Sequence, residues 1–439
     1  MGYGGGFGPA LPEVALDCSL CGVNGILTEI FQVVHGRQGK GLMKSSDTTQ
    51  TLTPDPAKLI ASARSMIPTL VRRSIEQKNR RGVLPETIAE MQAAGFFRVL
   101  QPKRWGGYEM DLNTFYEIEI ALGEGDMSAG WAYGVLGVVS WFLGLIDDRV
   151  AQEVWGQDIR TLICSSTMPA GKATVVDGGF RLTGHWRYAS ACEHSDWALL
   201  GGMVHAKNAQ PDWHFFIVPR RDYRTLDNWQ VAGLQGTGSI DVILEDVFVP
   251  SYRVQRMQDN FRLKGAGQAI NTSPLFRLPF GQIFVRGVST AGLGALQAML
   301  AALIANTRGR VSRAGGNASQ NPAIQLLCAE TAAAIDEMRQ TLHRNCRTLH
   351  DYARRDEAPP LELRLQYKFQ SSAVIERCTL LAARIFKATG AAGLSDDLPF
   401  GKILNDLLAA RQHISNQYEY YGANWGAVML GLENQDFLL

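Results

Sequence analysis

The spacing of hydrophobic residues predicts helices from Pro54 to about Arg160. Apolar residues follow three- and four-residue steps at Ile60, Ile67, Leu70, Val71 and Ile75. Steps of this kind place side chains on one face of a helix. Pro85 and Gly95 mark the start and the end of a second helix. Residues 114–121 and 131–145 continue the same pattern.

From about Thr161 to Pro250 the pattern is that of short β-strands. Val175 to Leu182 predicts a hairpin, because Asp-Gly-Gly at 177–179 supplies the positive φ angles of a tight turn. Three further β-rich runs are separated by turn residues, at 197–204, 215–218 and 242–249. These runs predict a small barrel or sandwich.

From about Pro279 to Leu408 the pattern is helical again. One apolar stripe comprises Leu293, Leu296, Leu300, Leu303 and Ile304, and another comprises Ile324, Leu327, Cys328, Ile335, Met338 and Leu342. Long stripes with short breaks predict a helical bundle.

The chain is therefore expected to be mainly α with a central β domain. We place an N-terminal helical domain at 43–160, a β-barrel or sandwich domain at 161–270 and a C-terminal helical bundle at 271–439. Residues 1–42 are Gly-rich and lack helical periodicity. We expect this extension to be disordered or absent from the native protein, with Met43 as the natural start.

Composition and charge narrow the possible partners. Hydrophobic residues make up 46% of the chain and charged residues 19%, which is enough to build a sizeable core. Lys+Arg and Asp+Glu nearly cancel at 43 and 42, whereas a nucleic-acid or anionic-membrane partner requires a basic excess. No apolar run is predicted to be long enough to span a bilayer. Seven scattered cysteines, with Cys18 and Cys21 as the one close pair, indicate free thiols in a reducing cytoplasm.

Several common cofactor motifs are absent from the sequence. The nearest match to the dinucleotide-binding glycine motif, at 123–128, lies between helical segments and carries two carboxylates where a pyrophosphate would bind. The eight histidines show no metal-ligand spacing, so no metal site is expected. A nicotinamide-binding domain is not expected either.

Four segments in order resemble the acyl-CoA dehydrogenase superfamily. They are the Pro…Gly-Gly loop at 101–108, the flavin-facing hairpin at 177–190, the Gly-rich turn and following strand at 233–250, and the terminal bundle. The resemblance covers roughly residues 55–439. It implies a dehydrogenase-like fold of N-terminal helices, a β domain and a C-terminal four-helix bundle.

The chain departs from the dehydrogenases where their chemistry lies. Residues 164–172 replace their Thr-Glu-Pro segment, and the place of their glutamate base falls close to His413. Glu419 is nearby but lacks the Gly-Thr that follows the base. With residues 184–197 and 409–413, these departures resemble flavin-dependent hydroxylases of the same fold, such as the oxygenase components that act on 4-hydroxyphenylacetate, secosteroid phenols, indoles and dibenzothiophene.

The hydroxylase resemblance implies a function. Such an oxygenase component receives FMNH₂ or FADH₂ from a separate NAD(P)H:flavin reductase and forms a C4a-hydroperoxide with O₂. It then hydroxylates a phenol, an indole or a polycyclic aromatic. Water must be excluded, or hydrogen peroxide is released instead.

The resemblance also implies roles for three residues. Ser190 lies near flavin N5, while Ser165 and His413 face the substrate; the Ser165 match can slip to Ser166. An imidazole, with an ordinary pKa of about 6.5, accepts a phenol proton or donates to a phenolate. The structural alternatives are a helix-end histidine near the helix dipole and a strand-end serine bonded to its own backbone.

Other residues are candidates for cofactor and substrate contacts. Trp186 either flanks the isoalloxazine or fills the core. Thr237, Gly238 and Ser239 either bind phosphate through their backbone N–H groups or form a plain turn. The apolar wall of the substrate pocket is predicted from Trp131, Val139, Ser140 and Trp141, together with Tyr133 and Val138. Hydroxyphenylacetate enzymes tend to carry a histidine near 139–140, so its absence favours a larger or more neutral aromatic.

Three other functions remain open. They are an acyl-CoA dehydrogenase with bound FAD and Glu419 as base, an N-hydroxylating or S-oxygenating monooxygenase of the same fold, and a non-catalytic scaffold. A homotetramer is expected, because the bundle carries apolar residues on more than one face, such as Leu361, Leu363, Leu365, Tyr367 and Phe369.

Overall fold

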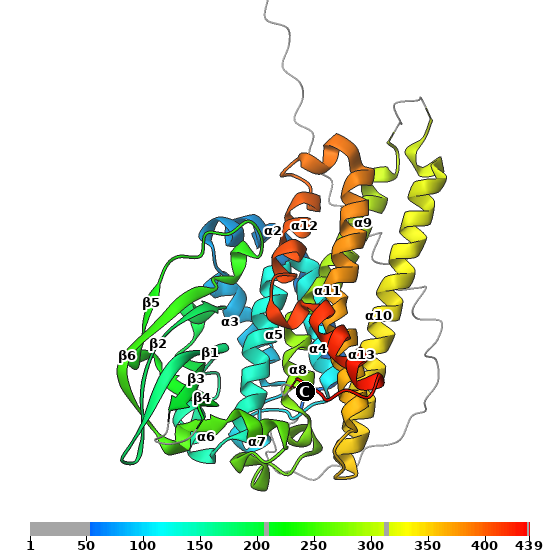
Figure 1. The fold of residues 1–439 in the computed structure, drawn as a ribbon. Helices are drawn as coiled ribbons and strands as arrows, with labels where there is room; N and C mark the ends of the chain where they lie inside the picture. Colours follow the sequence, from blue (N-terminus) through cyan, green and yellow to red (C-terminus); the bar gives the residue numbers. More distant parts are fainter. Residues whose placement is uncertain (1–52, 206–209, 311–315, 437–438) are drawn as a thin grey trace, which may run out of the picture. The chain divides into compact units, whose positions relative to one another are not determined.

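Helices form the first part of the fold in a computed structural model that describes residues 53–205, 210–310, 316–436 and 439 (Figure 1). They are α2 (Pro56–Arg80), α3 (Pro85–Ala93), α4 (Leu112–Gly125), α5 (Met127–Phe142) and α6 (Asp148–Trp155). Aspartates start four of them: Asp55, Asp111, Asp126 and Asp147 each accept a backbone N–H at the helix N-terminus. The predictions for residues 1–42, Cys18, Cys21 and Met43 lie outside the described residues.

The predicted helices are confirmed, but the buried face of α2 differs from the predicted stripe. Leu59, Ala63, Leu70 and Gln77 are its buried residues, whereas Val71 and Ile75 are each 56% exposed. One residue along a helix is a rotation of about 100°, so Leu70 and Val71 do not share a face. The sequence offered two overlapping stripes, and packing against α4 selected one.

The described strands form one seven-stranded sheet in the order β5-β6-β2-β1-β3-β4-β7. The strands are β1 (Ile163–Val176), β2 (Gly179–Ala189), β3 (Trp197–His205), β4 (Asp212–Pro219), β5 (Arg224–Leu226), β6 (Ile240–Pro250) and β7 (Val254–Arg256). The predicted hairpin is confirmed between β1 and β2, with Gly178 at φ 72°. The sheet curls strongly, since Phe180 of β2 meets Phe216 of β4 at 5.8 Å although two strands separate them.

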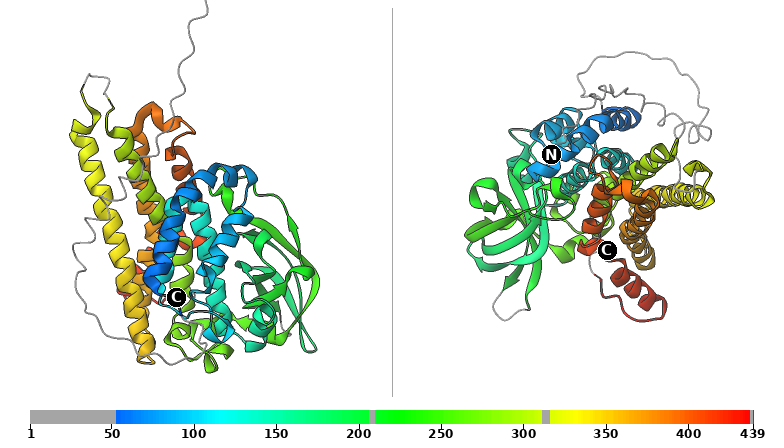
Figure 2. Two further views of the ribbon diagram at one scale, coloured as in Figure 1. Left: turned by 180° about the vertical axis from the view of Figure 1, so that it is seen from behind. Right: turned by 90° about the horizontal axis from the view of Figure 1, so that it is seen from above.

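Long helices form the C-terminal part. They are α9 (Ala291–Thr307), α10 (Pro322–Arg354), α11 (Leu361–Thr389), α12 (Phe400–Ala410) and α13 (Tyr418–Met429), preceded by the short α7 (Met257–Phe261) and α8 (Phe280–Phe284). Both predicted apolar stripes face the core, apart from partly exposed Ile304 and Cys328. The sheet and the long helices lie on opposite sides of α4 and α5, as the views of Figure 2 show. The predicted fold class is confirmed.

Helix α5 is the centre of this arrangement, because all its residues are buried. Met127–Leu145 and Phe280–Thr307 are long and apolar enough to cross a membrane, so the prediction that no run has that length was wrong. The first stretch is wholly buried inside the fold and the second is about two-thirds buried (67%). Both stretches therefore form core helices here. The five described cysteines are free.

Glycines allow α4 and α9 to touch through their backbones. A Cβ added to Gly294 of α9 would lie 2.0 Å from the carbonyl oxygen of Ile120, and one added to Gly123 of α4 would lie 2.4 Å from that of Ala291. Neither position can hold a side chain at this separation.

A buried carboxylate ties α4 to α10. The Glu117 carboxylate accepts hydrogen bonds from Arg339 and from His343, the latter at 2.8 Å. Burial alone raises the pKa of Glu117, but the bonds from His343 and Arg339 outweigh it and lower the pKa to about 2. Above its ordinary pKa this carboxylate therefore stabilises the fold, and the stabilisation is lost as the pH falls toward 2.

We predict that Glu117→Gln lowers the free energy of unfolding at pH 7 by about 3 kcal/mol. The gap between wild type and variant should shrink by more than half at pH 3, because the Glu117 carboxyl of the unfolded wild-type chain is protonated there while that of the folded chain is still largely ionised. Urea unfolding of both proteins at pH 7 and at pH 3 measures this difference in the free energy of unfolding. Glu90→Gln removes the more exposed ion pair with Arg73 and should cost less than about 1 kcal/mol. A Glu117→Gln gap independent of pH would contradict the prediction.

Candidate active site

Four separate parts of the chain meet at one polar cluster in the interior. The Trp131 indole N–H, from α5, donates to the Ser190 hydroxyl oxygen at 3.2 Å. Ser190, just after β2, lies 2.7 Å from the Ser239 hydroxyl. The His413 ring, just after α12, meets the Trp131 ring edge-to-face at 5.6 Å. The structure thus brings together Ser190, Ser239, Trp131 and His413, which were predicted as site residues from separate segments.

Three side-chain hydroxyl groups, those of Ser190, Ser239 and Thr237, form a hydrogen-bonded row that continues into the turn before β6. The Ser239 oxygen lies 2.7 Å from the Thr237 hydroxyl, which donates to the Leu234 carbonyl at 2.9 Å. Thr237 is fully buried and Ser239 is buried, and the Thr237 N–H also bonds the Leu234 carbonyl. The Thr237 N–H is therefore not free for a phosphate, and phosphate binding by the N–H groups of Gly238 and Ser239 stays a prediction. Thr237 and Ser239 meet the site through their hydroxyl groups.

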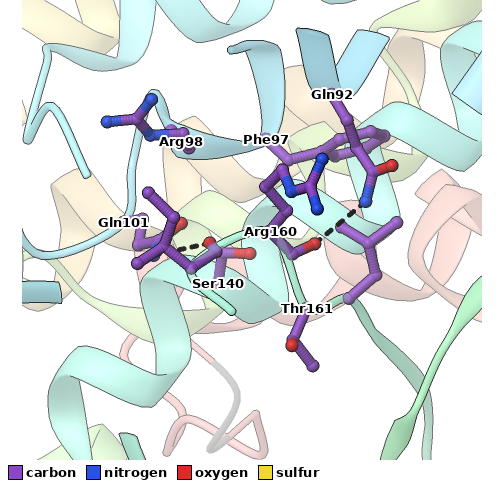
Figure 3. A pocket seen from close by; sticks show the side chains of 9 residues that line it. Gln92, Phe97, Arg98, Gln101, Ser140, Arg160 and Thr161 are labelled. Atoms are coloured by element: carbon purple, nitrogen blue, oxygen red, sulfur yellow. Dashed lines mark hydrogen bonds between the residues drawn. The ribbon is translucent and has the colours of Figure 1, made fainter. Parts of the chain in front are cut away.

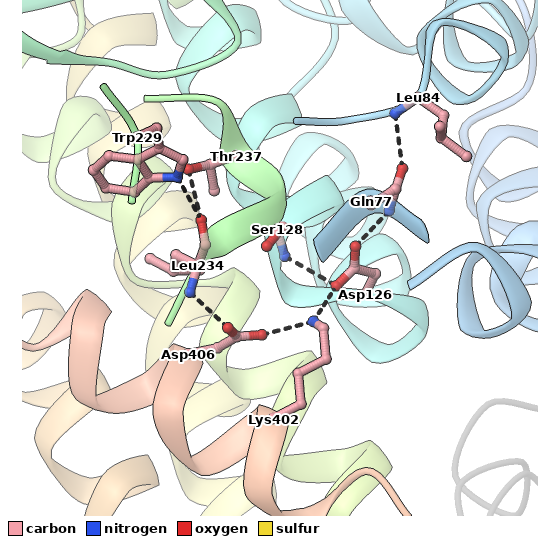
Figure 4. Close-up of polar contacts among 9 residues, drawn as sticks. All are labelled: Gln77, Leu84, Asp126, Ser128, Trp229, Leu234, Thr237, Lys402 and Asp406. Carbon is pink, nitrogen blue, oxygen red and sulfur yellow. Dashed lines mark hydrogen bonds and ion pairs between the residues drawn. The ribbon is translucent and has the colours of Figure 1, made fainter. Parts of the chain in front are cut away.

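An ion cluster fixes this turn from behind (Figure 4). The Lys402 ammonium contacts Asp126 at 2.6 Å and Asp406 at 2.8 Å, and both carboxylates are buried. The second oxygen of Asp406 accepts the Leu234 N–H at 2.6 Å. The two carboxylates raise the pKa of Lys402 despite its burial, so the ammonium stays charged. The prediction from sequence did not include Lys402, and only the spacing of Lys402 and Asp406 at i and i+4 hinted at it.

The geometry of His413 determines which ring nitrogen carries the proton. The Nδ1 atom accepts the Ser415 N–H at 3.2 Å. Burial lowers the pKa of His413 to about 4, so the ring is neutral at physiological pH. With Nδ1 as acceptor, the proton of the neutral ring is on Nε2. His413 therefore presents an N–H donor to its surroundings.

Tyr188 rather than Trp186 is the aromatic residue exposed beside Ser190. The Trp186 side chain is fully buried and its indole N–H donates to the Gly201 carbonyl at 2.6 Å. With no accessible face, it acts as core, the alternative the sequence left open. Tyr188 is 63% exposed, has φ 66° and packs edge-to-face against Trp229 at 6.1 Å. An aromatic residue with positive φ is strained, and such strain is common at functional sites. No sequence signal separated the two.

Two predicted residues in β1 have different environments. Ser166 donates its hydroxyl to the Arg187 carbonyl at 2.8 Å. Ser165 is half-buried and makes no side-chain hydrogen bond within the described residues. A hydroxyl that is free of protein partners is the better candidate for a ligand contact, so Ser165 keeps its predicted place ahead of Ser166.

The residues predicted to form one wall of the substrate pocket lie on opposite faces of α5. Ser140 lies about two and a half turns beyond Trp131, on the opposite face of α5. It borders a cavity of about 10 Å³, room for one water molecule, with Phe97, Gln101 and Arg160 (Figure 3). Trp141 is buried and donates to the Leu275 carbonyl at 2.9 Å, and Val139 is buried as well. The structure brings only Trp131 to the His413 cluster, and a shared wall with 139–141 stays a prediction.

Metal-binding clusters of His, Cys, Asp and Glu do not occur among the described residues. The groups that meet at the site are hydroxyls, one neutral imidazole and aromatic rings. These groups suit a flat, weakly charged ligand and a second aromatic molecule, because they offer hydrogen bonds without net charge.

Comparisons with known proteins decide the family. Residues 286–418 match the model "Acyl-CoA dehydrogenase, C-terminal domain". The chain is 33% identical to the flavin-dependent monooxygenase oxygenase subunit HsaA of Rhodococcus jostii over 377 residues, 85% of this chain and 99% of the relative. The chain belongs to the family of flavin-dependent monooxygenase oxygenase subunits.

Other relatives of this oxygenase agree. It is 31% identical to the FADH₂-dependent resorcinol hydroxylase oxygenase component of Rhizobium sp. over 382 residues, 83% of this chain and 92% of the relative. The crystal structure of 3-HSA hydroxylase from Rhodococcus sp. RHA1 matches with a TM-score of 0.84 and 33% identity, covering 87% of this chain and 98% of that one. The acyl-CoA dehydrogenase alternative required Glu419 as the catalytic base. Glu419 is exposed in the first turn of α13 and is therefore not part of the buried cluster.

We predict that the His413 ring of this oxygenase does not titrate between pH 8 and 5.5, because its pKa lies at about 4. NMR of the histidine Cε1–H signals, with His413→Gln to assign the resonance, measures this. A midpoint near pH 6.5 would show that the imidazole is hydrated and that its tautomer is not fixed by Ser415.

Proposed function

We propose that this oxygenase hydroxylates a phenolic aromatic with O₂ and a reduced flavin, FMNH₂ or FADH₂, delivered by a separate NAD(P)H:flavin reductase. Reduced flavin, when bound, supplies the activation of dioxygen. The observation that carries the proposal is the neutral His413, which offers an Nε2–H donor beside Trp131 and the Ser190 hydroxyl row. The FADH₂-dependent resorcinol hydroxylase named above supports both the cofactor and the substrate class.

The residues around Ser190 fit a flavin. Tyr188 offers an exposed aromatic face for the isoalloxazine, and Ser190 offers a hydroxyl oxygen for N5. Thr237 and Ser239 support Ser190 from behind, while Gly238, at φ 57°, lets the turn close against α2. We assign substrate contacts to Trp131, which packs against His413, and to Ser165, whose hydroxyl has no side-chain hydrogen bond within the described residues.

His413 orients the substrate rather than removing its proton. Since Nδ1 is occupied by the Ser415 N–H, the remaining Nε2–H can only donate. A donor stabilises a phenolate or phenol oxygen, which leaves the ring electron-rich where oxygen attacks. This favours phenols, including polycyclic ones, over indoles, whose ring N–H donates, and over sulfur substrates, whose sulfur accepts only weakly.

We predict that His413→Ala lowers hydroxylation by roughly 10²–10⁴-fold, the scale for losing a positioned proton donor or acceptor. Reduced-flavin affinity should stay unchanged, and the O₂ consumed should appear as hydrogen peroxide. His413→Gln, which keeps an N–H donor, should retain more hydroxylation than His413→Ala. The ratio of hydroxylated product to peroxide, measured with a flavin reductase and a panel of phenols, tests this. Wild-type coupling in His413→Ala, or no coupling with any phenol in the wild type, would overturn the proposal.

We further propose a homotetramer in the cytoplasm. Leu365 and Tyr367, named from sequence for the interface, are buried within the chain itself. Other apolar side chains of the bundle and its C-terminal end are exposed instead: Leu326, Leu380, Leu408, Met429, Leu430 and Leu432. These exposed apolar side chains belong to α10, α11, α12 and α13 and to the residues that follow α13, and they support an interface formed by the bundle.

We predict a tetrameric mass in light scattering, and a smaller species for the double variant Leu380→Glu with Leu430→Glu. Val71→Glu on α2, at an exposed apolar residue away from the bundle, is the matched control. A stable wild-type monomer would refute the tetramer.

A further inference from the structure

The hydroxyl row behind Ser190 has a single direction. Thr237 has one hydroxyl proton. The Leu234 carbonyl accepts it at 2.9 Å, nearer than the N–H groups of Thr237 and Trp229, which share this carbonyl at 3.1 Å, so we assign the Thr237 proton to Leu234. The Thr237 oxygen must therefore accept the proton of Ser239, 2.7 Å away. Ser239 has then no proton left for Ser190, so Ser190 donates to Ser239 across their 2.7 Å contact.

This direction leaves Ser190 with an acceptor function alone. Its own proton lies on Ser239, and one of its two lone pairs accepts the Trp131 indole N–H. One lone pair remains for a ligand. Trp131 strengthens the arrangement, since an indole N–H is a donor that cannot reverse its role.

The end of the row is fixed by charge. The Leu234 carbonyl also accepts the Trp229 indole N–H at 3.1 Å, and the Leu234 N–H is held by Asp406. Asp406 is in turn held by Lys402, as Figure 4 shows. Because the Leu234 carbonyl is held in place, it continues to accept the Thr237 hydroxyl proton. This bond sets the direction of the other hydrogen bonds in the row.

We propose that Thr237 and Ser239 are positioning residues that make the site select the reduced flavin over the oxidised flavin. The inference rests on the proposed place of Ser190 at flavin N5. Reduced flavin carries a proton on N5, which Ser190 can accept, whereas N5 of oxidised flavin carries only a lone pair. Two facing acceptors repel, so oxidised flavin is disfavoured. An oxygenase that receives its flavin from a separate reductase needs this selection.

The test measures binding rather than turnover. Dissociation constants for reduced flavin, under anaerobic conditions, and for oxidised flavin give a selectivity ratio for each variant. Thr237→Val keeps the side-chain shape but removes the hydroxyl, so the Ser239 proton is released and the row can reverse. The ratio should then fall roughly tenfold, the scale of one mismatched buried hydrogen bond. Thr237→Ser keeps the hydroxyl and should retain the wild-type ratio.

Two further variants keep the test decisive. Ser239→Ala removes the acceptor of the Ser190 proton and should lower the ratio roughly tenfold as well. This variant keeps the test available if Thr237→Val does not fold. Ser190→Ala removes the acceptor and should lower the ratio as well. A drop for Ser190→Ala with wild-type ratios for Thr237→Val and Ser239→Ala would overturn the inference and leave the proposed function in place. An unchanged ratio in Ser190→Ala would overturn the inference together with the place of Ser190 at N5. An equal drop in Thr237→Ser would also overturn the inference, because the hydroxyl would then be irrelevant.

Discussion

The bridge from Lys402 to Asp126 and Asp406 fixes the relative positions of elements that lie far apart in the sequence. Asp126 caps α5 and also accepts a hydrogen bond from Gln77 of α2 at 2.5 Å, while Asp406 holds the turn at Leu234. Charges taken out of water destabilise a fold unless they are paired and hydrogen-bonded. Because each carboxylate oxygen has a partner, α2, α5, α12 and this turn have one arrangement that satisfies all of them.

The active site depends on that arrangement. Trp131 follows Asp126 on α5, His413 follows Asp406 just beyond α12, and Thr237 follows Leu234 in the turn. These three residues thus follow a member of the ion cluster or its hydrogen-bond partner Leu234, whereas Ser190 is connected to the cluster only through Ser239 and Thr237. The charges stay behind the turn, and the groups that face the proposed ligands are hydroxyls, a neutral imidazole and aromatic rings. Such a site can bind a flavin and an aromatic ring without drawing in water to hydrate a charge.

Hydrogen-bond direction is the second constraint. Ser415 decides that His413 donates, and the Leu234 carbonyl decides that Ser190 accepts. Both decisions come from backbone groups, whose donor or acceptor character cannot change. In isolation, a neutral imidazole nitrogen or a serine hydroxyl can take part in hydrogen bonds in more than one way. In the folded protein His413 donates and Ser190 accepts.

The sequence by itself determined the order of helices, strands and helices, the β1–β2 hairpin and the four segments that contain Ser190, Thr237, Trp131 and His413, because periodicity, turn residues and motifs are local properties. It did not determine which of two overlapping stripes α2 buries or which of Trp186 and Tyr188 is exposed. Nor did it indicate that Lys402 pairs with Asp126, 276 positions away. Only the tertiary structure decided these, since they depend on contacts between distant segments and on which hydrogen-bond partner each side chain finds.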